Sequence, residues 1–392
     1  QALAEAFTQR SLRLWVIAAG VPIMATDGAD GPPKRRWHRT QEDGSSKGLN
    51  ARSVGEIPAA SASSTSGYVA NIGTSSGSFQ PKCPGEADPK IKVVFDMETG
   101  DPDDVLTLLL LASHPKVQLL AVTITPGSVD QISLVFWILK ELELSDVRVG
   151  AQEWPRNAEK KCIRGRFYES FGRISEDSLQ GVETAAQVLL ECCDEETTLL
   201  TGGPLHNLGH TLELHDFKLG RWVAQGGFAG EGVVPRELQM EKFLGKQICP
   251  TWNFGGNRPA AEAALASKAI SRKVLVSKNV CHRAVYDARF HAAFLEALKQ
   301  SDQSEPKSTR AIALKLFCSA MEKYQRGEGK KLHDPLAMAA VVDEAVCSFR
   351  EVHVFNDRQG WGSVLQAGTN TWISIDYNDE RFRQILVGSG PT

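Results

Sequence analysis

Five carboxylates fall within nine residues of this chain, at Asp96, Glu98, Asp101, Asp103 and Asp104. Before them, the run Ile91 to Phe95 is apolar and β-branched, which is typical of a buried parallel strand whose carboxyl end opens onto a crevice. After them, Asp101 stands at an N-cap position, Pro102 at the first helical position, and Val105 to Leu111 form an apolar helical face. The segment therefore predicts a strand, an acidic loop and a helix, with function at the strand end.

Helix capping alone does not account for so many acids. A cap and a helix dipole need one or two carboxylates, each worth about 0.3–1 kcal/mol. Five carboxylates repel one another unless protons or a cation intervene. Oxygen-only ligands favour a hard cation, Ca²⁺ or Mg²⁺, and the residues by themselves do not choose between the two. We therefore predict metal or proton chemistry at this loop.

The acidic segment resembles the signature of the nucleoside hydrolase family, Asp-x-Asp-Pro-Gly-x-Asp-Asp, which holds a Ca²⁺ ion. Asp96, Glu98, Asp103 and Asp104 align with the four acids of that signature. The segment here is one residue longer, has glutamate at the second acidic position, and carries an additional acid at Asp101. The resemblance implies an open, mostly parallel, Rossmann-like α/β sheet with flanking helices. It also implies hydrolysis of the N-glycosidic bond of a ribonucleoside or a related ribosyl compound.

Three further segments resemble the family in the same chain order. Thr201 to Leu208 resembles a turn whose backbone carbonyl completes the metal shell, here at Gly202. Pro250 to Phe254 resembles the segment whose asparagine grips the ribose, and Lys331 to Ala337 resembles the segment that supplies a late metal ligand. Each segment taken singly fits a turn, a loop amide or a helix cap equally well or better. Their common order favours the functional interpretation.

Asp334-Pro335 repeats the Asp-Pro helix opening of Asp101-Pro102. Two helices that are distant in the sequence are therefore expected to present carboxylates from their N-termini to one crevice. A divalent ion would then link the two halves of the domain.

The resemblance implies a role for each site residue. Glu98 is the first candidate for the general base and Asp96 the second, while His333 is the candidate acid for the leaving base. Trp252 fits a core aromatic equally well, and a solvated or structural histidine is the commoner case for His333. The expected metal ligands are Glu98, Asp104, Asp334 and the Gly202 carbonyl. The expected substrate-binding residues are Asp103, Ser128, Trp252, Asn253 and Asn257.

Two departures from the family pattern concern the substrate. The family's His-Gly-rich segment corresponds here to Arg166 to Gly172, and Thr251 replaces an acid two positions before Asn253. Tyr168 or Glu169 is a candidate for the lost base contact. The alternative is that the substrate is a ribosyl compound other than a common nucleoside.

Two other functions compete with the hydrolase. The opening Phe95 to Thr99 fits a haloacid-dehalogenase-like phosphatase that uses Mg²⁺, but the second acid expected there is aspartate, and Asn253 and Asp334 have no role in it. A catalytically silent nucleoside- or ribose-binding protein is the second rival, because Glu98 and the longer loop depart from the signature.

The chain divides by composition into an extension and one catalytic domain. Residues 1–89, rich in Ser, Gly and Ala, are predicted to be a disordered or targeting extension, and residues 90–392 the hydrolase-like domain. The predicted strands of this domain are Ile91 to Phe95, Gln118 to Ile124, Thr198 to Thr201, Arg221 to Gln225 and Lys273 to Ser277. The predicted helices are Pro102 to Ser113, Val129 to Leu142, Val182 to Cys192, Asn207 to Glu213, Pro259 to Ala266, Val285 to Lys299, Thr309 to Tyr324 and Pro335 to Asp343. Short strands and turns are predicted over Ala345 to Tyr377.

Charge and cysteine usage narrow the choice of partners. The net charge is −3, with acids and bases interspersed over the domain, which gives no footprint for nucleic acid or an anionic membrane. The apolar run Leu12 to Ala25 is too short to span a bilayer. The eight cysteines are scattered, which favours reduced thiols in a cytoplasmic enzyme, with organellar targeting by the extension as the alternative. We expect a small-molecule nucleoside substrate, and the sequence leaves open whether identical subunits pair.

Overall fold

The structure, a computed structural model, describes residues 89–163, 167–171, 179, 181–326 and 329–388. The predicted extension over residues 1–89 therefore lies, apart from its last residue, outside the described part of the chain. The predicted base-contacting segment is partly outside it as well, since neither Arg166 nor Gly172 is described.

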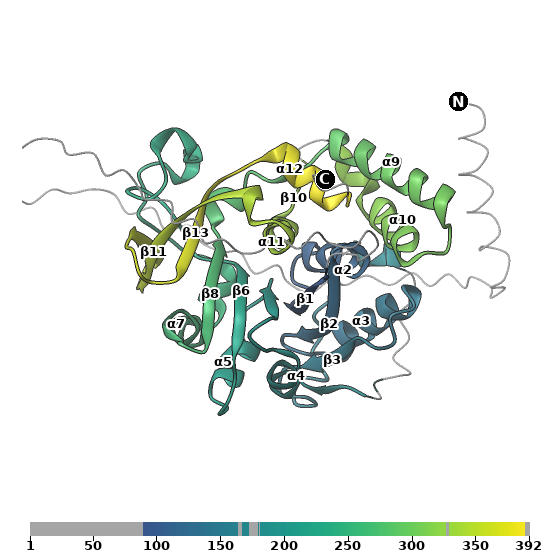
Figure 1. Cartoon of the computed structure of the whole chain (residues 1–392), viewed down its shortest axis with the longest axis horizontal. Helices are drawn as coiled ribbons and strands as arrows, with labels where there is room; N and C mark the ends of the chain where they lie inside the picture. Colours follow the sequence, from purple (N-terminus) through teal and green to yellow (C-terminus); the bar gives the residue numbers. More distant parts are fainter. Residues whose placement is uncertain (1–88, 164–166, 172–178, 180, 327–328, 389–392) are drawn as a thin grey trace, which may run out of the picture. The chain divides into compact units, whose positions relative to one another are not determined.

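An eleven-stranded sheet forms the centre of the described domain, in the order β4-β3-β2-β1-β5-β6-β8-β13-β11-β12-β7 (Figure 1). The strands from β4 to β13 in this order pair in parallel, and β11, β12 and β7 extend the sheet by antiparallel pairing. The strands span Ile91–Met97 (β1), Val117–Ile124 (β2), Arg148–Ala151 (β3), Glu183–Thr184 (β4), Thr198–Thr201 (β5), Leu219–Gln225 (β6), Ile248–Cys249 (β7), Ile270–Val276 (β8), Cys347–Asp357 (β11), Gly360–Leu365 (β12) and Thr371–Tyr377 (β13). Val285–Tyr286 (β9) and Lys330–Lys331 (β10) form a separate antiparallel pair.

The strand order reverses at β1. The chain moves outward from β1 through β2, β3 and β4, and then returns to place β5 on the other side of β1. The register sets Asp96 of β1 opposite Thr123 of β2 and Thr201 of β5. In open α/β sheets, such a switch point leaves a crevice at the carboxyl ends of the strands, where ligands bind.

Helices cover both faces of the sheet. They span Asp103–Ser113 (α2), Val129–Glu141 (α3), Ala185–Cys192 (α4), His206–Leu212 (α5), Trp252–Gly256 (α6), Arg258–Ala266 (α7), Lys278–Cys281 (α8), Ala288–Ser304 (α9), Thr309–Met321 (α10), His333–Val342 (α11) and Asp379–Leu386 (α12). Short 3₁₀ turns lie at Tyr168–Phe171, Arg236–Leu238, Glu241–Phe243, Glu322–Gln325 and Glu344–Val346. Figure 1 shows α4, α5 and α7 on the side of the sheet away from α9, α11 and α12. None of the described helices is long and apolar enough to cross a membrane.

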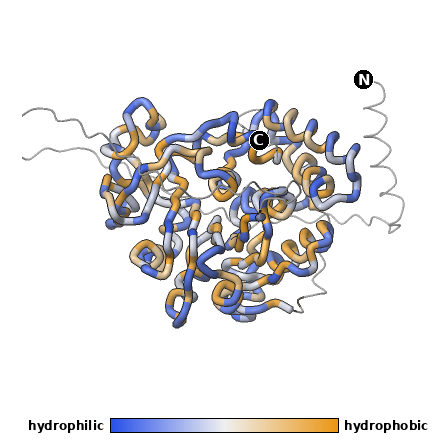
Figure 2. The backbone as a smooth tube through the Cα atoms, in the orientation of Figure 1, coloured by the Kyte–Doolittle hydropathy of each residue, from blue (hydrophilic) through white to orange (hydrophobic). Residues whose placement is uncertain are grey.

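Alternation along β1 divides the core into two layers. Val93, Phe95 and Met97 face α2, α3, α10 and α11, whereas Val94 faces α4, α5 and α7. All four side chains are fully buried, as expected for a parallel strand covered on both faces. Figure 2 shows hydrophobic residues along β1, α2 and α10, where these elements pack together.

The predicted fold class is confirmed, with local corrections. The strand predicted over Thr198 to Thr201 matches β5, whereas β3 and α12 were not predicted. Residues predicted to open two helices form strands instead: Glu183–Thr184 is β4 and Val285–Tyr286 is β9. In the second case Asp287 stops the helix from starting earlier, because its side chain accepts the N–H groups of the first turn of α9.

Candidate active site

The carboxyl ends of β1, β5 and β6 open onto a cavity of about 340 Å³. The cavity lies at the switch point, the usual place for a ligand in such a sheet. It is lined by Glu98, Gly100, Asp101, Asp103, Asp104, Gly202, Gln225, Trp252, Asn253, His333 and Asp334. All the predicted site residues line this cavity except Asp96, Ser128 and Asn257.

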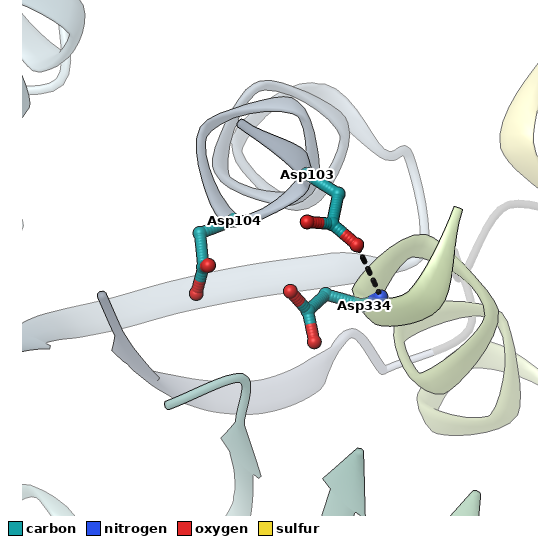
Figure 3. Close-up of side chains that lie close together, drawn as sticks. All are labelled: Asp103, Asp104 and Asp334. Atoms are coloured by element: carbon teal, nitrogen blue, oxygen red, sulfur yellow. Dashed lines mark hydrogen bonds between the residues drawn. The ribbon is translucent and has the colours of Figure 1, made fainter. Parts of the chain in front are cut away.

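Three buried aspartates meet at the floor of this cavity (Figure 3). Asp103 and Asp104 come from the first turn of α2, and Asp334 comes from the first turn of α11. One oxygen from each carboxylate lies within 4.8 Å of the others, and no side chain of the three is more than 3% exposed. The two helix N-termini therefore converge on one point, as the repeated Asp-Pro pattern predicted.

The electrostatics of this cluster fit a bound cation. Burial, followed by repulsion from neighbouring carboxylates, raises the pKa values of Asp104 and Asp334 well above the ordinary range. Asp334 Oδ1 is buried and has no hydrogen-bond partner among the described residues, although such atoms are almost always paired. Gly202 closes over the cluster, since a Cβ at this position would lie 2.7 Å from Asp104 Oδ1. An oxygen-only set with an unpaired buried oxygen is suited to a hard divalent ion.

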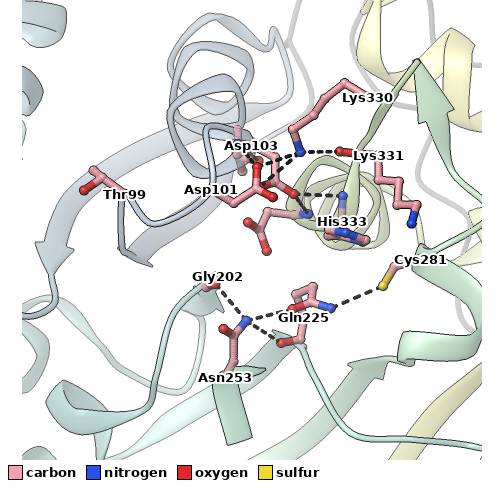
Figure 4. A network of polar contacts seen from close by, with 12 residues as sticks. Thr99, Asp101, Asp103, Gly202, Gln225, Asn253, Cys281, Lys330, Lys331 and His333 are labelled. Carbon is pink, nitrogen blue, oxygen red and sulfur yellow. Dashed lines mark hydrogen bonds and ion pairs between the residues drawn. The ribbon is translucent and has the colours of Figure 1, made fainter. Parts of the chain in front are cut away.

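Asp103 has a second task, because it caps α11. Its Oδ2 accepts the backbone N–H groups of His333 at 3.0 Å and Asp334 at 3.3 Å. The predicted start of this helix at Pro335 is therefore wrong: α11 begins at His333, because a side chain from α2 supplies the cap. Lys330 Nζ lies 2.6 Å from Asp101 Oδ1 and 3.7 Å from Asp103 Oδ1, which neutralises the outer part of the acidic loop (Figure 4).

Asp96 lies beneath the cavity rather than in its wall. Its Oδ1 accepts hydrogen bonds from Thr123 Oγ1 at 2.6 Å and Asn207 Nδ2 at 2.7 Å, while the buried Oδ2 has no partner in the described part of the chain. Burial raises the pKa of Asp96 to about 7, against the effect of the two hydrogen bonds. Asp96 thus lies outside the lining of the cavity and is held by Thr123 and Asn207.

We expect Asn207→Ala to destabilise the domain by about 1–3 kcal/mol, because it removes one of the two donors to the fully buried Asp96 carboxylate. Urea unfolding followed by circular dichroism measures this change. Glu213→Ala, at the exposed end of the same helix, is the matched control and should be close to neutral. Equal stability of the two variants would show that Asn207 does not support Asp96.

Glu98 and Trp252 form the open side of the cavity. Trp252 is 74% exposed, so the prediction that it could be a core aromatic is wrong. Its Nε1 donates to Glu98 Oε1 at 2.8 Å, which fixes the carboxylate at the cavity wall. Burial raises the pKa of Glu98 to about 6, a value close to that of an effective general base at neutral pH.

Asn253 ties the ends of β5 and β6 together. Its Nδ2 donates to the Gly202 carbonyl at 2.8 Å, and to the Gln225 carbonyl and side-chain oxygen at 3.0 and 2.7 Å (Figure 4). These bonds fix the orientation of the side-chain amide. They also hold the Gly202 carbonyl at the cavity, where it leaves a second lone pair for another partner.

Comparison with known proteins identifies the family. The family model "Inosine-uridine preferring nucleoside hydrolase" matches residues 93–384, which is more than half of the chain. This chain belongs to the inosine-uridine preferring nucleoside hydrolase family. It is therefore an N-glycosyl hydrolase by family and fold, as the strand-end signature predicted.

Relatives of this nucleoside hydrolase are distant in sequence. An uncharacterized protein of Aquifex aeolicus is 29% identical over 316 residues, which cover 76% of this chain and 98% of the relative. RihA of Klebsiella pneumoniae, a pyrimidine-specific ribonucleoside hydrolase, is 24% identical over 325 residues, which cover 76% of this chain and 97% of the relative. A solved plant nucleoside hydrolase superposes with a TM-score of 0.54 at 17% identity, over 77% of this chain and 100% of that chain. The purine-preferring ribonucleoside hydrolase from Gardnerella vaginalis superposes with a TM-score of 0.53 at 14% identity, over 76% of this chain and 97% of that chain. This likeness again shows the shared fold.

His333 lines the cavity of this nucleoside hydrolase as a neutral imidazole. Burial, and then the charge of Lys330, lowers its pKa to about 4. Its ring centroid lies 4.7 Å from that of His282, and its buried Nδ1 finds no hydrogen-bond partner among the residues that the structure describes. At neutral pH the resting protein therefore holds no acidic proton on His333 for a leaving base.

The predicted substrate contacts Ser128 and Asn257 are helix caps. Ser128 is fully buried and forms a capping box with Gln131 at the start of α3. Asn257 accepts the Ala260 N–H at 3.2 Å at the start of α7. Neither residue lines the cavity, because each side chain is already used by its own helix.

Three residues of the nucleoside hydrolase site were missed at the level of sequence. Lys330 neutralises the acidic loop, Gln225 holds Asn253, and Asn207, which lies in the family-like turn but was given no role of its own, holds Asp96. The Gly226-Gly227 pair after Gln225 was the one local sequence pattern that pointed to any of these three residues. The proposed substitute contact Tyr168 is buried, and its hydroxyl donates to the Thr99 carbonyl at 2.8 Å, so it supports the acidic loop instead.

Proposed function

We propose that this chain hydrolyses the N-glycosidic bond of a ribonucleoside with a bound divalent cation, Ca²⁺ in preference to Mg²⁺. One observation carries the proposal: Asp104 and Asp334 meet from separate helices at the switch-point cavity, with an oxygen of Asp334 left unpaired. Large flexible oxygen shells suit Ca²⁺ better than Mg²⁺, which keeps more of its water. The relatives include both pyrimidine-specific and purine-preferring enzymes, so the base is not part of the proposal.

Four residues would hold the cation, two from the β1–α2 segment, one from the turn after β5 and one from α11. They are Asp104 of α2, Asp334 of α11, the Gly202 carbonyl after β5, and Glu98 after β1. When bound, the cation would bind the ribose 2′- and 3′-hydroxyls and orient the attacking water. Asp96, buried behind this set, would hold the loop in place through Thr123 and Asn207.

Glu98 is the proposed general base. It lines the cavity, its pKa of about 6 keeps it mostly ionised at pH 7, and Trp252 orients it through one hydrogen bond. The carboxylates around it would stabilise the positive charge that develops on the sugar as the glycosidic bond breaks. Asp96 remains the second candidate, but a base must reach the water whose proton it takes, and Asp96 does not line the cavity.

Asn253 and Asp103 are the proposed ribose ligands. Asn253 is 4% exposed and fixed by three hydrogen bonds, so its amide has one orientation at the cavity wall. Asp103 is held by the same kind of contacts, since Oδ2 caps α11 and Oδ1 lies 3.7 Å from Lys330 Nζ. Groups that are already held by the protein bind a sugar with little further loss of conformational entropy.

His333 is the proposed partner of the leaving base. With a pKa of about 4 it is neutral at pH 7, but negative charge on the departing base would raise this pKa, so any proton transfer is confined to the transition state. We therefore expect His333→Ala to slow uridine cleavage about 10²-fold and to leave p-nitrophenyl riboside, whose leaving group needs no proton, close to unchanged. Steady-state rates on both substrates make the measurement. Equal losses on the two substrates would remove His333 from leaving-group catalysis.

A reducing-sugar assay on a panel of ribonucleosides tests the proposed function, with Ca²⁺ present or chelated. We expect ribose release that chelation stops and added Ca²⁺ restores. Nucleoside binding without turnover would instead indicate a silent binder. Phosphate release from phosphate esters would indicate a phosphatase.

A further inference from the structure

Three lysines and a histidine gather beside the His333 side of the cavity. We call Lys242, Lys278, Lys331 and His282 the lysine cluster. Lys242 Nζ lies 2.8 Å from His282 Nδ1. Lys242 Nζ and Lys278 Nζ lie 4.9 and 6.0 Å from the centroid of the Phe243 ring, which forms a common floor. Segments far apart in the sequence therefore bring like charges together.

The cluster lacks a counter-charge among the described residues. None of its three ammonium groups pairs with a described carboxylate, whereas the neighbouring Lys330 pairs with Asp101 at 2.6 Å. Burial, and then the charges of Lys331 and Lys278, lowers the pKa of Lys242. Burial and the surrounding cations also lower the pKa of His282 to about 3. Cations held close together without an anion form a ready site for one.

Several contacts connect the cluster to the cavity. The His282 and His333 rings lie 4.7 Å apart, and Lys331 precedes His333 by two positions (Figure 4). On the other side, Lys278 Nζ donates to the Pro250 carbonyl at 2.6 Å, two residues before Trp252 of the cavity wall. The four described residues of the cluster do not themselves line the cavity, and these contacts place the cluster next to its His333 and Trp252 walls.

Thr251, between Pro250 and Trp252, is a second indication. It is 8% exposed, and its buried Oγ1 has no hydrogen-bond partner within the described ranges. No carboxylate stands at this position to repel an anion. The lysine cluster beside the cavity is thus cationic, while the floor of the cavity is anionic.

Building on the proposed function, we propose that the preferred substrate is a ribonucleoside that carries an anionic group, phosphate or carboxylate, which the lysine cluster binds. Opposite charges at the acidic floor and at the lysine cluster would orient such a molecule, with its ribose diol at the floor and its anionic group at the cluster. A phosphate on the ribose 5′ oxygen and a carboxylate on the base are the two sources of this charge.

The test compares kcat/KM of the full chain with Ca²⁺ on uridine, uridine 5′-monophosphate and orotidine. We expect the kcat/KM of one of the two anionic compounds to exceed that of uridine by at least about tenfold. The compound with the higher kcat/KM identifies the source of the anion. The combined variant Lys242→Gln, Lys278→Gln and Lys331→Gln should remove this preference. Lys268→Gln, an exposed lysine after α7, is the matched control and should keep it. Equal kcat/KM on all three compounds would overturn the proposal.

Binding measurements distinguish failure of the anion-site proposal from failure of the hydrolase proposal. Calorimetry compares ribose with ribose 5-phosphate, and uridine with orotidine, in the unmodified chain and the triple lysine variant. A tighter anionic member in either pair, lost in the variant, supports the cluster even if no compound is cleaved, in which case only the hydrolase proposal fails. Equal affinities within both pairs overturn the inference even if uridine is cleaved.

Discussion

Asp104→Asn and Asp334→Asn should each lower kcat/KM on a ribonucleoside by about 10³-fold or more. Each variant removes a charged oxygen ligand from the site that would hold the cation, and a catalytic cation contributes several kcal/mol, with tenfold in rate for each 1.36 kcal/mol. Calorimetric titration with Ca²⁺ should show one site in the unmodified chain and greatly weakened binding in both variants. Asp146→Asn, an exposed aspartate before β3, is the control and should keep activity and binding.

Stability distinguishes this loss from misfolding. Since the folded-state pKa of Asp104 is raised, its ionised form opposes folding, and this cost grows as the pH rises through the ordinary aspartate range toward neutrality. Without cation at pH 7, Asp104→Asn should therefore have a higher Tm than the unmodified chain, because it removes one of the repelling charges and its amide oxygen is still able to accept the Glu98 N–H. An active variant that binds no Ca²⁺ would contradict the proposed ligand set.

Glu98→Gln should lower kcat by about 10²–10⁴-fold at saturating Ca²⁺, the usual contribution of a general base. Glutamine keeps an oxygen for the Trp252 N–H and for the cation, so the loss should fall on kcat more than on KM.

The pH profile provides the second readout for Glu98. Glu98 must be ionised to accept a proton, so kcat/KM of the unmodified chain should rise with pH and level off once the carboxylate is ionised. The midpoint of this rise is the Glu98 pKa, which is about 6 without a cation. A bound cation favours the carboxylate and moves the midpoint to lower pH. This acid limb should vanish from the residual activity of Glu98→Gln. A full acid limb in that variant would transfer the role of base to another group, with Asp96 the first to test.

The β1 to α2 segment was predictable because its signals are local. A buried strand, an acidic turn and a capped apolar helix follow one another, and the observed elements begin and end within two residues of the predicted bounds. The meeting of Asp104 with Asp334 was predictable from two repeats of one local motif at helix N-termini. Local chemistry of this kind requires no knowledge of tertiary contacts.

The remaining features depend on contacts that sequence spacing does not encode. Asp103 caps a helix that lies far along the chain, and this is why α11 begins before Pro335. Lys330 and Asn207 were unassigned because each pairs with an acid on another element. Ser128 does not line the cavity, since its capping box with Gln131 forms within its own helix.

Diffraction from crystals of the chain soaked in Ca²⁺ and ribose tests the central claim most directly. The account predicts one anomalous peak per chain, bounded by Asp104, Asp334 and the Gly202 carbonyl, with the two vicinal hydroxyls of the sugar on the same ion. A calcium peak elsewhere, or ribose bound in the cavity with no ion beside these residues, would contradict it.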